Sequence, residues 1–136
     1  MDANVLVDAG FLVALLKRRD THHRWAVSVT ERLPPPWRTC EAALSETFHL
    51  IGADGAPALR ALLERGAVAL AFDLGDNLGP VLKLLSKYAD QGASLADACL
   101  VRMSETFSAP MVLTTDSDFR IYRRHGRQVV PCTTPS

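Results

Sequence analysis

The sequence predicts an α/β fold, a three-layer α/β/α sandwich with a mainly parallel central sheet. Short apolar runs alternate along the chain with longer segments of helical spacing, as expected when strands and crossover helices follow one another. The strand-like runs are apolar throughout rather than at every second position, which indicates burial on both faces of a sheet. With 136 residues, 48% of them hydrophobic, the chain is expected to form one domain over residues 1–136.

Each expected element has a local signal. Gly52 and Gly66 are placed to end helices, Thr21 is placed to cap one, and the prolines at 34–36 indicate an extended loop. The expected strands are residues 4–7, 37–40, 67–72, 111–115 and 128–130. The expected helices are residues 10–18, 22–33, 41–52, 56–66, 77–90 and 94–107.

The charge balance limits the classes of partner. The 15 Lys and Arg residues equal the 15 Asp and Glu residues, so no overall excess of charge points to nucleic acid or to a membrane. Two short stretches are locally basic, and for each a solvated face is as good an interpretation as a phosphate-binding surface. They are Lys17, Arg18, Arg19 and Arg24 near the start, and Arg120, Arg123, Arg124 and Arg127 near the end.

The cysteines and the first apolar run indicate a reducing, cytoplasmic setting. The three cysteines stand far apart without a C-x-x-C pair, which argues against a disulfide framework or a zinc site. The apolar run 5–16 is interrupted by Asp8, lacks a basic start and is too short to cross a bilayer. A protein without membrane contact is therefore expected.

Acidic residues stand at places where they are expected to meet. Asp8 ends the first strand and Asp116 follows a later one, and parallel strands share one carboxyl edge, where ligands bind. Glu46 and Asp97 are single acids in otherwise apolar helical segments, and a buried carboxylate without a partner is costly. Asp118 lies two residues beyond Asp116.

Each acid also has an ordinary structural interpretation. Asp97 with Ser94 matches a capping box, and for Asp97 alone the cap is favoured. Asp118 is equally suited to capping a turn, Asp8 to a strand-end turn, and Glu46 to pairing with an arginine. Together, however, such acids repel one another unless a cation lies among them, and oxygen ligands alone suit Mg²⁺ or Mn²⁺.

Four segments carry a family resemblance. They are VLVDAGFLVALL with Asp8, TCEAALSETFHLI with Glu46, KYADQGASLADACLVRMSE with Asp97, and VLTTDSDFRIYR with Thr114, Asp116 and Asp118. In their order and setting these segments resemble a PIN domain, in particular the small toxin ribonucleases of VapC type. One departure is Ala9, because family members commonly carry a polar residue directly after the first acid.

The resemblance implies an endoribonuclease, the toxin of a type II toxin-antitoxin system. It implies a catalytic set of Asp8, Glu46, Asp97 and Asp116, and Mg²⁺ or Mn²⁺ bound by Asp8, Asp97, Asp116 and Asp118 with Thr114 in support. The implied partners are RNA, a cognate antitoxin and a second copy of the chain in a homodimer. RNA phosphates are expected at Lys17, Arg18, Arg19, Arg120, Arg123 and Arg124.

Two other classes stay open at this point. A receiver-like domain also gathers acids and Mg²⁺ at the carboxyl edge of a parallel sheet, but its acid pair comes at the first strand and a lysine follows the last. Here the pair comes late and no lysine follows Lys87. A catalytically degenerate binding module, acting through RNA or protein contacts alone, would keep the basic surface and tolerate loss of the carboxylates.

Overall fold

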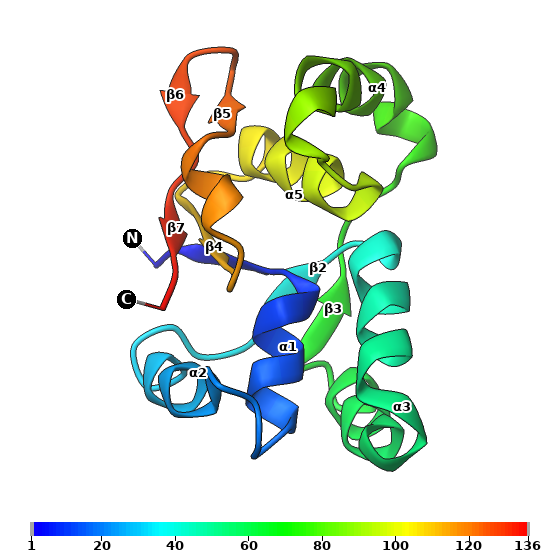
Figure 1. Ribbon diagram of the computed structural model, residues 1–136, viewed down its shortest axis with the longest axis vertical. Helices are drawn as coiled ribbons and strands as arrows, with labels where there is room; N and C mark the ends of the chain where they lie inside the picture. The colour runs from blue at the N-terminus through cyan, green and yellow to red at the C-terminus, as the bar shows by residue number, and fades with distance from the viewer. Residues whose placement is uncertain (1, 136) are drawn as a thin grey trace.

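A five-stranded parallel sheet forms the centre of the molecule, shown in Figure 1 as a computed structural model that describes residues 2–135. Its strand order is β3-β2-β1-β4-β7, and each neighbouring pair is parallel. The strands are β1 (Asn4–Val7), β2 (Trp37–Thr39), β3 (Val68–Leu70), β4 (Pro110–Leu113) and β7 (Cys132–Thr133). The order places β1 in the middle, so the residue that follows β1 lies at the centre of the carboxyl edge.

Helices cover both faces of this sheet. They are α1 (Ala9–Leu16), α2 (His23–Val29), α3 (Glu41–Glu64), α4 (Leu78–Lys87) and α5 (Leu95–Thr106). Side chains of β1 alternate between two cores: Leu6 packs with α4 and α5, whereas Val5 and Val7 pack with α1 and α2. The three-layer α/β/α sandwich predicted from the sequence is therefore confirmed.

Short segments complete the chain. They are the single 3-10 turns η1 (Gly75–Asn77), η2 (Ala89–Gln91) and η3 (Ser117–Arg120), and an antiparallel hairpin of β5 (Arg123–Arg124) with β6 (Gln128–Val129). The strand expected at 128–130 thus lies partly in the hairpin, and the edge strand of the sheet comes later, at β7. The hairpin turns through Gly126, whose positive φ of 80° suits glycine.

The helix boundaries follow local chemistry. Gly52 adopts a left-handed φ of 67° and divides α3 into two helical halves, as the glycine predicted. Thr21 was expected to cap the second helix, and this prediction is wrong. Asp20 accepts a hydrogen bond from the backbone N–H of His22 (2.8 Å), so Asp20 organises that turn instead. Within residues 2–135, no helix is both long and apolar enough to cross a membrane.

Candidate active site

Asp8 and Thr114 meet at the centre of the carboxyl edge. Val7 of β1 is in register with Leu113 of β4, so the next residues of the two strands are neighbours. The Thr114 hydroxyl donates to Oδ2 of Asp8 (2.8 Å), and the backbone N–H of Ala9 donates to Oδ1 (2.6 Å). Both carboxylate oxygens are thus held, and Asp8 also caps α1.

A close approach of α1 to the loop after β4 secures this arrangement. A Cβ placed on Gly10 would lie 2.1 Å from Oγ1 of Thr115, so only glycine fits there without displacing Thr115. The loop that carries Thr114 and Asp116 can therefore pack directly against the first turn of α1. A glycine in the first turn of the helix that follows the first strand is the sequence signal for this contact.

Asp97 reaches the same edge from the first turn of α5. Ser94 and Asp97 form the expected capping box, with Asp97 Oδ2 accepting from the backbone N–H of Ser94 (3.0 Å). Oδ2 also accepts a hydrogen bond from the buried hydroxyl of Tyr122 (3.2 Å). The structural interpretation of Asp97 is therefore correct, and it leaves Oδ1 free of any hydrogen bond from the described residues.

Asp116 begins the turn η3. Its Oδ1 accepts from the backbone N–H of Asp118 (2.9 Å), and its own N–H donates to Oγ1 of Thr114 (3.0 Å). Thr114 thereby links Asp116 to Asp8 through one hydroxyl group. The cap of this turn is Asp116 rather than Asp118, which stays half-buried beside it.

Glu46 lies on the surface of α3. The lone acid of an apolar helix was expected to be buried, and this prediction is wrong. The buried stripe of this half of α3 is Ala43, Thr47 and Ile51, one residue per turn, and Glu46 lies beside it. Its carboxylate is nevertheless near enough to Asp8 to repel it.

Repulsion from neighbouring carboxylates contributes to the raised pKa of two acids of the site, Asp8 and Asp97. Burial, together with the charges of Asp97 and Glu46, raises the pKa of Asp8 to about 7, against the opposing hydrogen bonds from Thr114 and Ala9. Burial and the charge of Asp116 likewise raise the pKa of Asp97. The pKa of Tyr122 is raised by burial and by the nearby carboxylates, Asp97 first and then Asp116 and Asp118.

The acids lack positive partners. Among residues 2–135 the salt bridge joins Arg102 to Glu105, away from all five acids. Carboxylates that repel one another and have no Lys or Arg partner form a donor set suited to a hard divalent cation, so the residues fit Mg²⁺ or Mn²⁺. In that described part of the chain, no three His, Cys, Asp or Glu side chains already lie close enough to enclose an ion.

The predicted phosphate-binding residues fall in two places. Lys17 ends α1 at the opposite end from Asp8, donating to the carbonyl of Leu50 (3.0 Å), with Arg18 and Arg19 exposed beyond it. Arg120, Arg123 and Arg124 follow η3. Arg120 is exposed, and its Nη2 donates a hydrogen bond to Oγ1 of Thr134 (2.7 Å). Arg123 and Arg124 are half-buried. Arg124 donates to the carbonyl of Ser104 and so ties the hairpin to α5.

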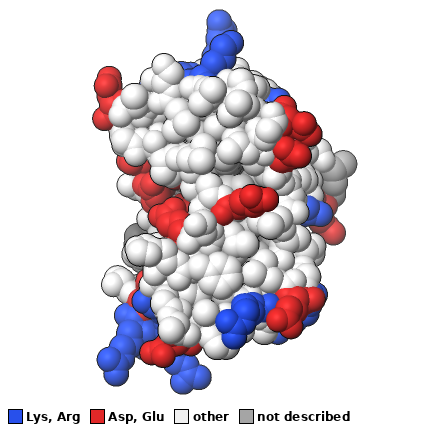
Figure 2. Space-filling view, turned by 90° about the vertical axis from the view of Figure 1, so that its right-hand side faces the viewer, with Lys and Arg blue, Asp and Glu red and all other residues white. Residues whose placement is uncertain are grey.

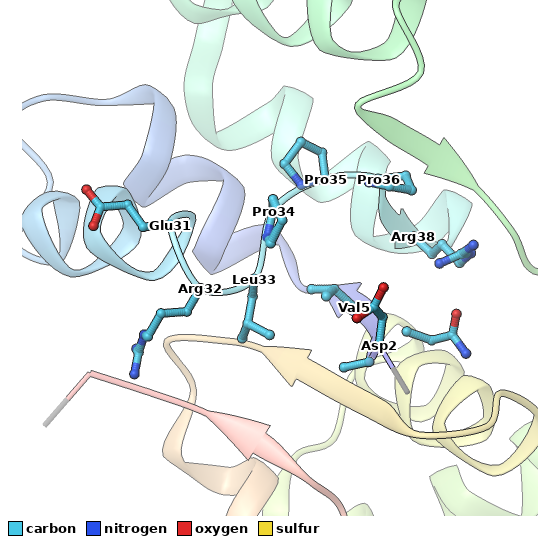
Figure 3. A pocket seen from close by; sticks show the side chains of 11 residues that line it. Asp2, Val5, Glu31, Arg32, Leu33, Pro34, Pro35, Pro36 and Arg38 are labelled. Atoms are coloured by element: carbon cyan, nitrogen blue, oxygen red, sulfur yellow. The ribbon is translucent and has the colours of Figure 1, made fainter.

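Two cavities differ in their relation to the acids. One of about 490 Å³ lies between the starts of α3 and α5, lined by Cys40, Phe72 and Leu95 among others. In Figure 2, which looks at the side formed by α3 and α4, Asp and Glu side chains gather at the indented left margin, between largely uncharged surfaces. The other cavity, about 540 Å³, opens at the opposite edge of the sheet near the proline loop. There Arg32 and Arg38 point in different directions (Figure 3), so they do not converge on one anion.

Comparison with known proteins identifies the family. A model of the PIN domain family matches residues 5–124, and the chain therefore belongs to the PIN domain family. Its fold is that of VapC20 from Mycobacterium tuberculosis, which is described as a toxin that cleaves the sarcin-ricin loop. The TM-score is 0.74 at 23% sequence identity, over 84% of this chain and 91% of that one. No curated protein sequence matches the chain.

Two tyrosines at the site were missed in the sequence. Tyr122 contacts Asp97, and its ring packs against Tyr88 (4.9 Å between centroids) and Phe119 (5.1 Å). Tyr122 follows η3 within a run of arginines, where no periodic pattern marks it as buried. Only its position four residues after Asp118, the second acid of the pair at the strand end, gives a signal.

Proposed function

We propose that the chain is a metal-dependent endoribonuclease and the toxin of a type II toxin-antitoxin system, with RNA as its substrate. Membership in the PIN family supports nuclease chemistry. The observation that carries the proposal is the gathering of acids at one sheet edge without a cationic partner: besides burial, the charge of Asp97 raises the pKa of Asp8, and the charge of Asp116 raises the pKa of Asp97. The fold-level likeness to a toxin that cleaves the sarcin-ricin loop supports structured RNA as a substrate class.

The roles of the acids follow from their placement. Asp8, Asp97, Asp116 and Asp118 are the residues that would hold the ion. A Mg²⁺ or Mn²⁺ ion bound there supplies a water of lowered pKa and positive charge beside the scissile phosphate. The exposure of Glu46 and its charge effect on Asp8 support a role for Glu46 as the group that accepts a proton from the attacking water.

Thr114 and Tyr122 act through the acids. Thr114 fixes Oδ2 of Asp8, and Tyr122 fixes Oδ2 of Asp97, so each carboxylate keeps an oxygen oriented for the ion. Burial, and then the charges of the surrounding carboxylates, raise the pKa of Tyr122, so its hydroxyl stays protonated at neutral pH. It therefore serves as a donor to Asp97 throughout the working range.

Protein partners are proposed on the exposed apolar surface. Leu78 and Leu82 on α4 and Leu95 on the adjoining α5 are 48%, 53% and 41% exposed, and exposed leucines on two packed helices suit a cognate antitoxin. Leu50 on α3 is 46% exposed and is a candidate contact in a homodimer. A cytoplasmic setting accords with the three free cysteines.

Cleavage of RNA by the purified chain tests the proposal. We expect cleavage with Mg²⁺ or Mn²⁺, no cleavage in EDTA, and a loss of more than about 100-fold in Asp8→Asn, since even outer-shell changes commonly cost 10–100-fold. Asp54→Asn, an exposed acid on the far half of α3, is the matched control and should keep full activity. RNA binding without any metal-dependent cleavage would instead identify a degenerate binding module.

A further inference from the structure

A small basic cavity lies between α4 and the β5–β6 hairpin, away from the acids. Its volume is about 180 Å³, and three of its lining residues are cations: Lys83 and Lys87 from α4 and Arg123 from β5. Lys83 and Lys87 are four residues apart, so they lie on one face of the helix, one turn from each other. At about 30 Å³ per water molecule, the cavity has room for one phosphate group and part of its hydration.

The positive charge of this cavity is not neutralised locally. Its single lining acid, Glu105, is already engaged: Oε1 pairs with Arg102 (3.2 Å) and Oε2 accepts from the backbone N–H of His125 (2.7 Å). No Asp or Glu follows Asp118 in the sequence, so the hairpin contributes cations only. The lining thus has an excess of positive charge directed at a concave space.

Arg123 is held ready to bind an anion. Its Nη1 donates to the carbonyls of Arg120 (2.7 Å), Ile121 (3.2 Å) and Tyr122 (3.0 Å), which fixes the plane of the guanidinium. Nη2 has no hydrogen-bond partner among the described residues. Lys87 donates to the carbonyl of Gly126 (3.2 Å), which joins α4 to the hairpin across the cavity.

Two tyrosines whose rings pack against each other connect the cavity to the acids. The backbone N–H of Arg123 donates to the hydroxyl of Tyr88 (2.9 Å), and the ring of Tyr88 packs on that of Tyr122. Tyr122 in turn contacts Asp97. The cavity and the acids are thus joined through the protein interior by two buried tyrosines.

We infer that this cavity, defined by Lys83, Lys87 and Arg123, is a subsite for a backbone phosphate of the RNA substrate, outside the cleaved bond. The inference rests on the proposed ribonuclease function and adds a surface that holds the strand in register. An anion held by three cations in a small hollow suits a phosphate, whose oxygens accept several charge-assisted hydrogen bonds. An acidic protein segment is the competing occupant, and the experiment below separates the two.

The salt dependence of RNA binding tests the inference. The cleavage-blocked variant Asp97→Asn binds a fluorescent single-stranded RNA, and log K is measured against log salt. Each phosphate contact contributes about −0.7 to this slope for single strands. Because the cavity holds a single phosphate, adding Lys83→Gln and Lys87→Gln together is expected to reduce the magnitude of the slope by about 0.7.

The control removes two charges elsewhere. Arg60 and Arg65 are exposed at the end of α3, and replacing both by Gln changes the net charge equally without touching the cavity. A Lys83→Gln/Lys87→Gln slope equal to that of this control would overturn the inference. The inference would also be overturned if the Lys83→Gln/Lys87→Gln variant kept the slope of its Asp97→Asn parent but no longer bound poly-glutamate. That result would identify the cavity as a protein-binding site. Cleavage of RNA by the wild-type chain tests the proposed function separately, so the two failures remain distinguishable.

Discussion

The hydroxyl of Thr114 donates a 2.8 Å hydrogen bond to Asp8, a residue 106 positions earlier in the chain. This bond crosses between β1 and β4 where both strands end, and the same hydroxyl accepts from the N–H of Asp116. Donation to the carboxylate opposes the effect of burial on the pKa of Asp8 and favours its ionised form. One buried threonine thus links Asp8 to Asp116.

Replacing Thr114 by Val is expected to weaken metal binding. The change keeps the shape of the side chain but removes the donor to Asp8, so we expect about a 10–100-fold loss in Mn²⁺ affinity. The unpaired N–H of Asp116 should also lower the free energy of unfolding by about 1–3 kcal/mol. Thr114→Ser keeps the hydroxyl and should retain most of the Mn²⁺ affinity. Titration with Mn²⁺, followed by electron paramagnetic resonance, measures the affinity of each variant. Equal losses in the Val and Ser variants would contradict the assigned role.

Tyr122→Phe tests whether the tyrosine positions Asp97. The phenylalanine ring still packs on Tyr88 and Phe119, so the fold should remain, while Asp97 loses a donor. We expect about a tenfold rise in the Mn²⁺ concentration needed for half-maximal cleavage. Tyr88→Phe removes a hydroxyl that does not contact Asp97 and serves as the control. If both variants need the same Mn²⁺ concentration as the wild type, Tyr122 has only a packing role.

Gly10→Ala should disturb the loop that carries Thr114. The added methyl group meets Oγ1 of Thr115 at 2.1 Å, and overpacking of this kind typically costs about 1–3 kcal/mol. Thr115→Ala removes that oxygen, so the double variant should recover part of the lost stability. Urea unfolding of the four proteins in a double-mutant cycle measures the coupling. Additive effects would show that the two residues do not press on each other.

The raised pKa of Asp8 predicts a stability that falls as pH rises. The folded state holds a proton on Asp8 up to a pKa of about 7, whereas the unfolded chain releases it near the ordinary aspartate value. The folded state therefore binds more protons between about pH 4 and 7, and the free energy of unfolding contributed by Asp8 decreases across that window. Chemical unfolding of the metal-free protein at a series of pH values should show this decrease, and Asp8→Asn should reduce it.

Metal binding should show the opposite trend. The ion requires ionised carboxylates, so its affinity should rise by about tenfold between pH 6 and 8, with release of a proton. Calorimetry with Mn²⁺ in buffers of different ionisation enthalpy measures both quantities. An affinity independent of pH would mean that Asp8 does not bind the ion.

The fold and the positions of the acids at the sheet edge were predictable because short-range sequence signals mark them. An apolar strand followed by Asp8, and another followed by Asp116, is enough to place two carboxylates at one edge of a parallel sheet. The capping box placed Asp97 at the start of α5 for a local reason as well. These predictions needed only periodicity and the common direction of parallel strands.

The missed features depend on tertiary packing. Glu46 is exposed because α3 buries a narrow stripe, and the helix is too apolar for its sequence to show which face is covered. Tyr122 reaches Asp97 only because η3 turns the chain back toward α5. The cavity between α4 and the hairpin likewise joins residues about 40 positions apart, with no local pattern that brings them together.

The most direct test of the central claim is the anomalous scattering of Mn²⁺ in crystals soaked at about pH 8. We expect an anomalous difference peak coordinated by Asp8 and Asp97, with Asp116 bound directly or through water. We expect no such peak in crystals of Asp8→Asn/Asp97→Asn. A wild-type crystal saturated with Mn²⁺ that shows no density between these carboxylates, or a peak that survives in the double variant, would contradict it.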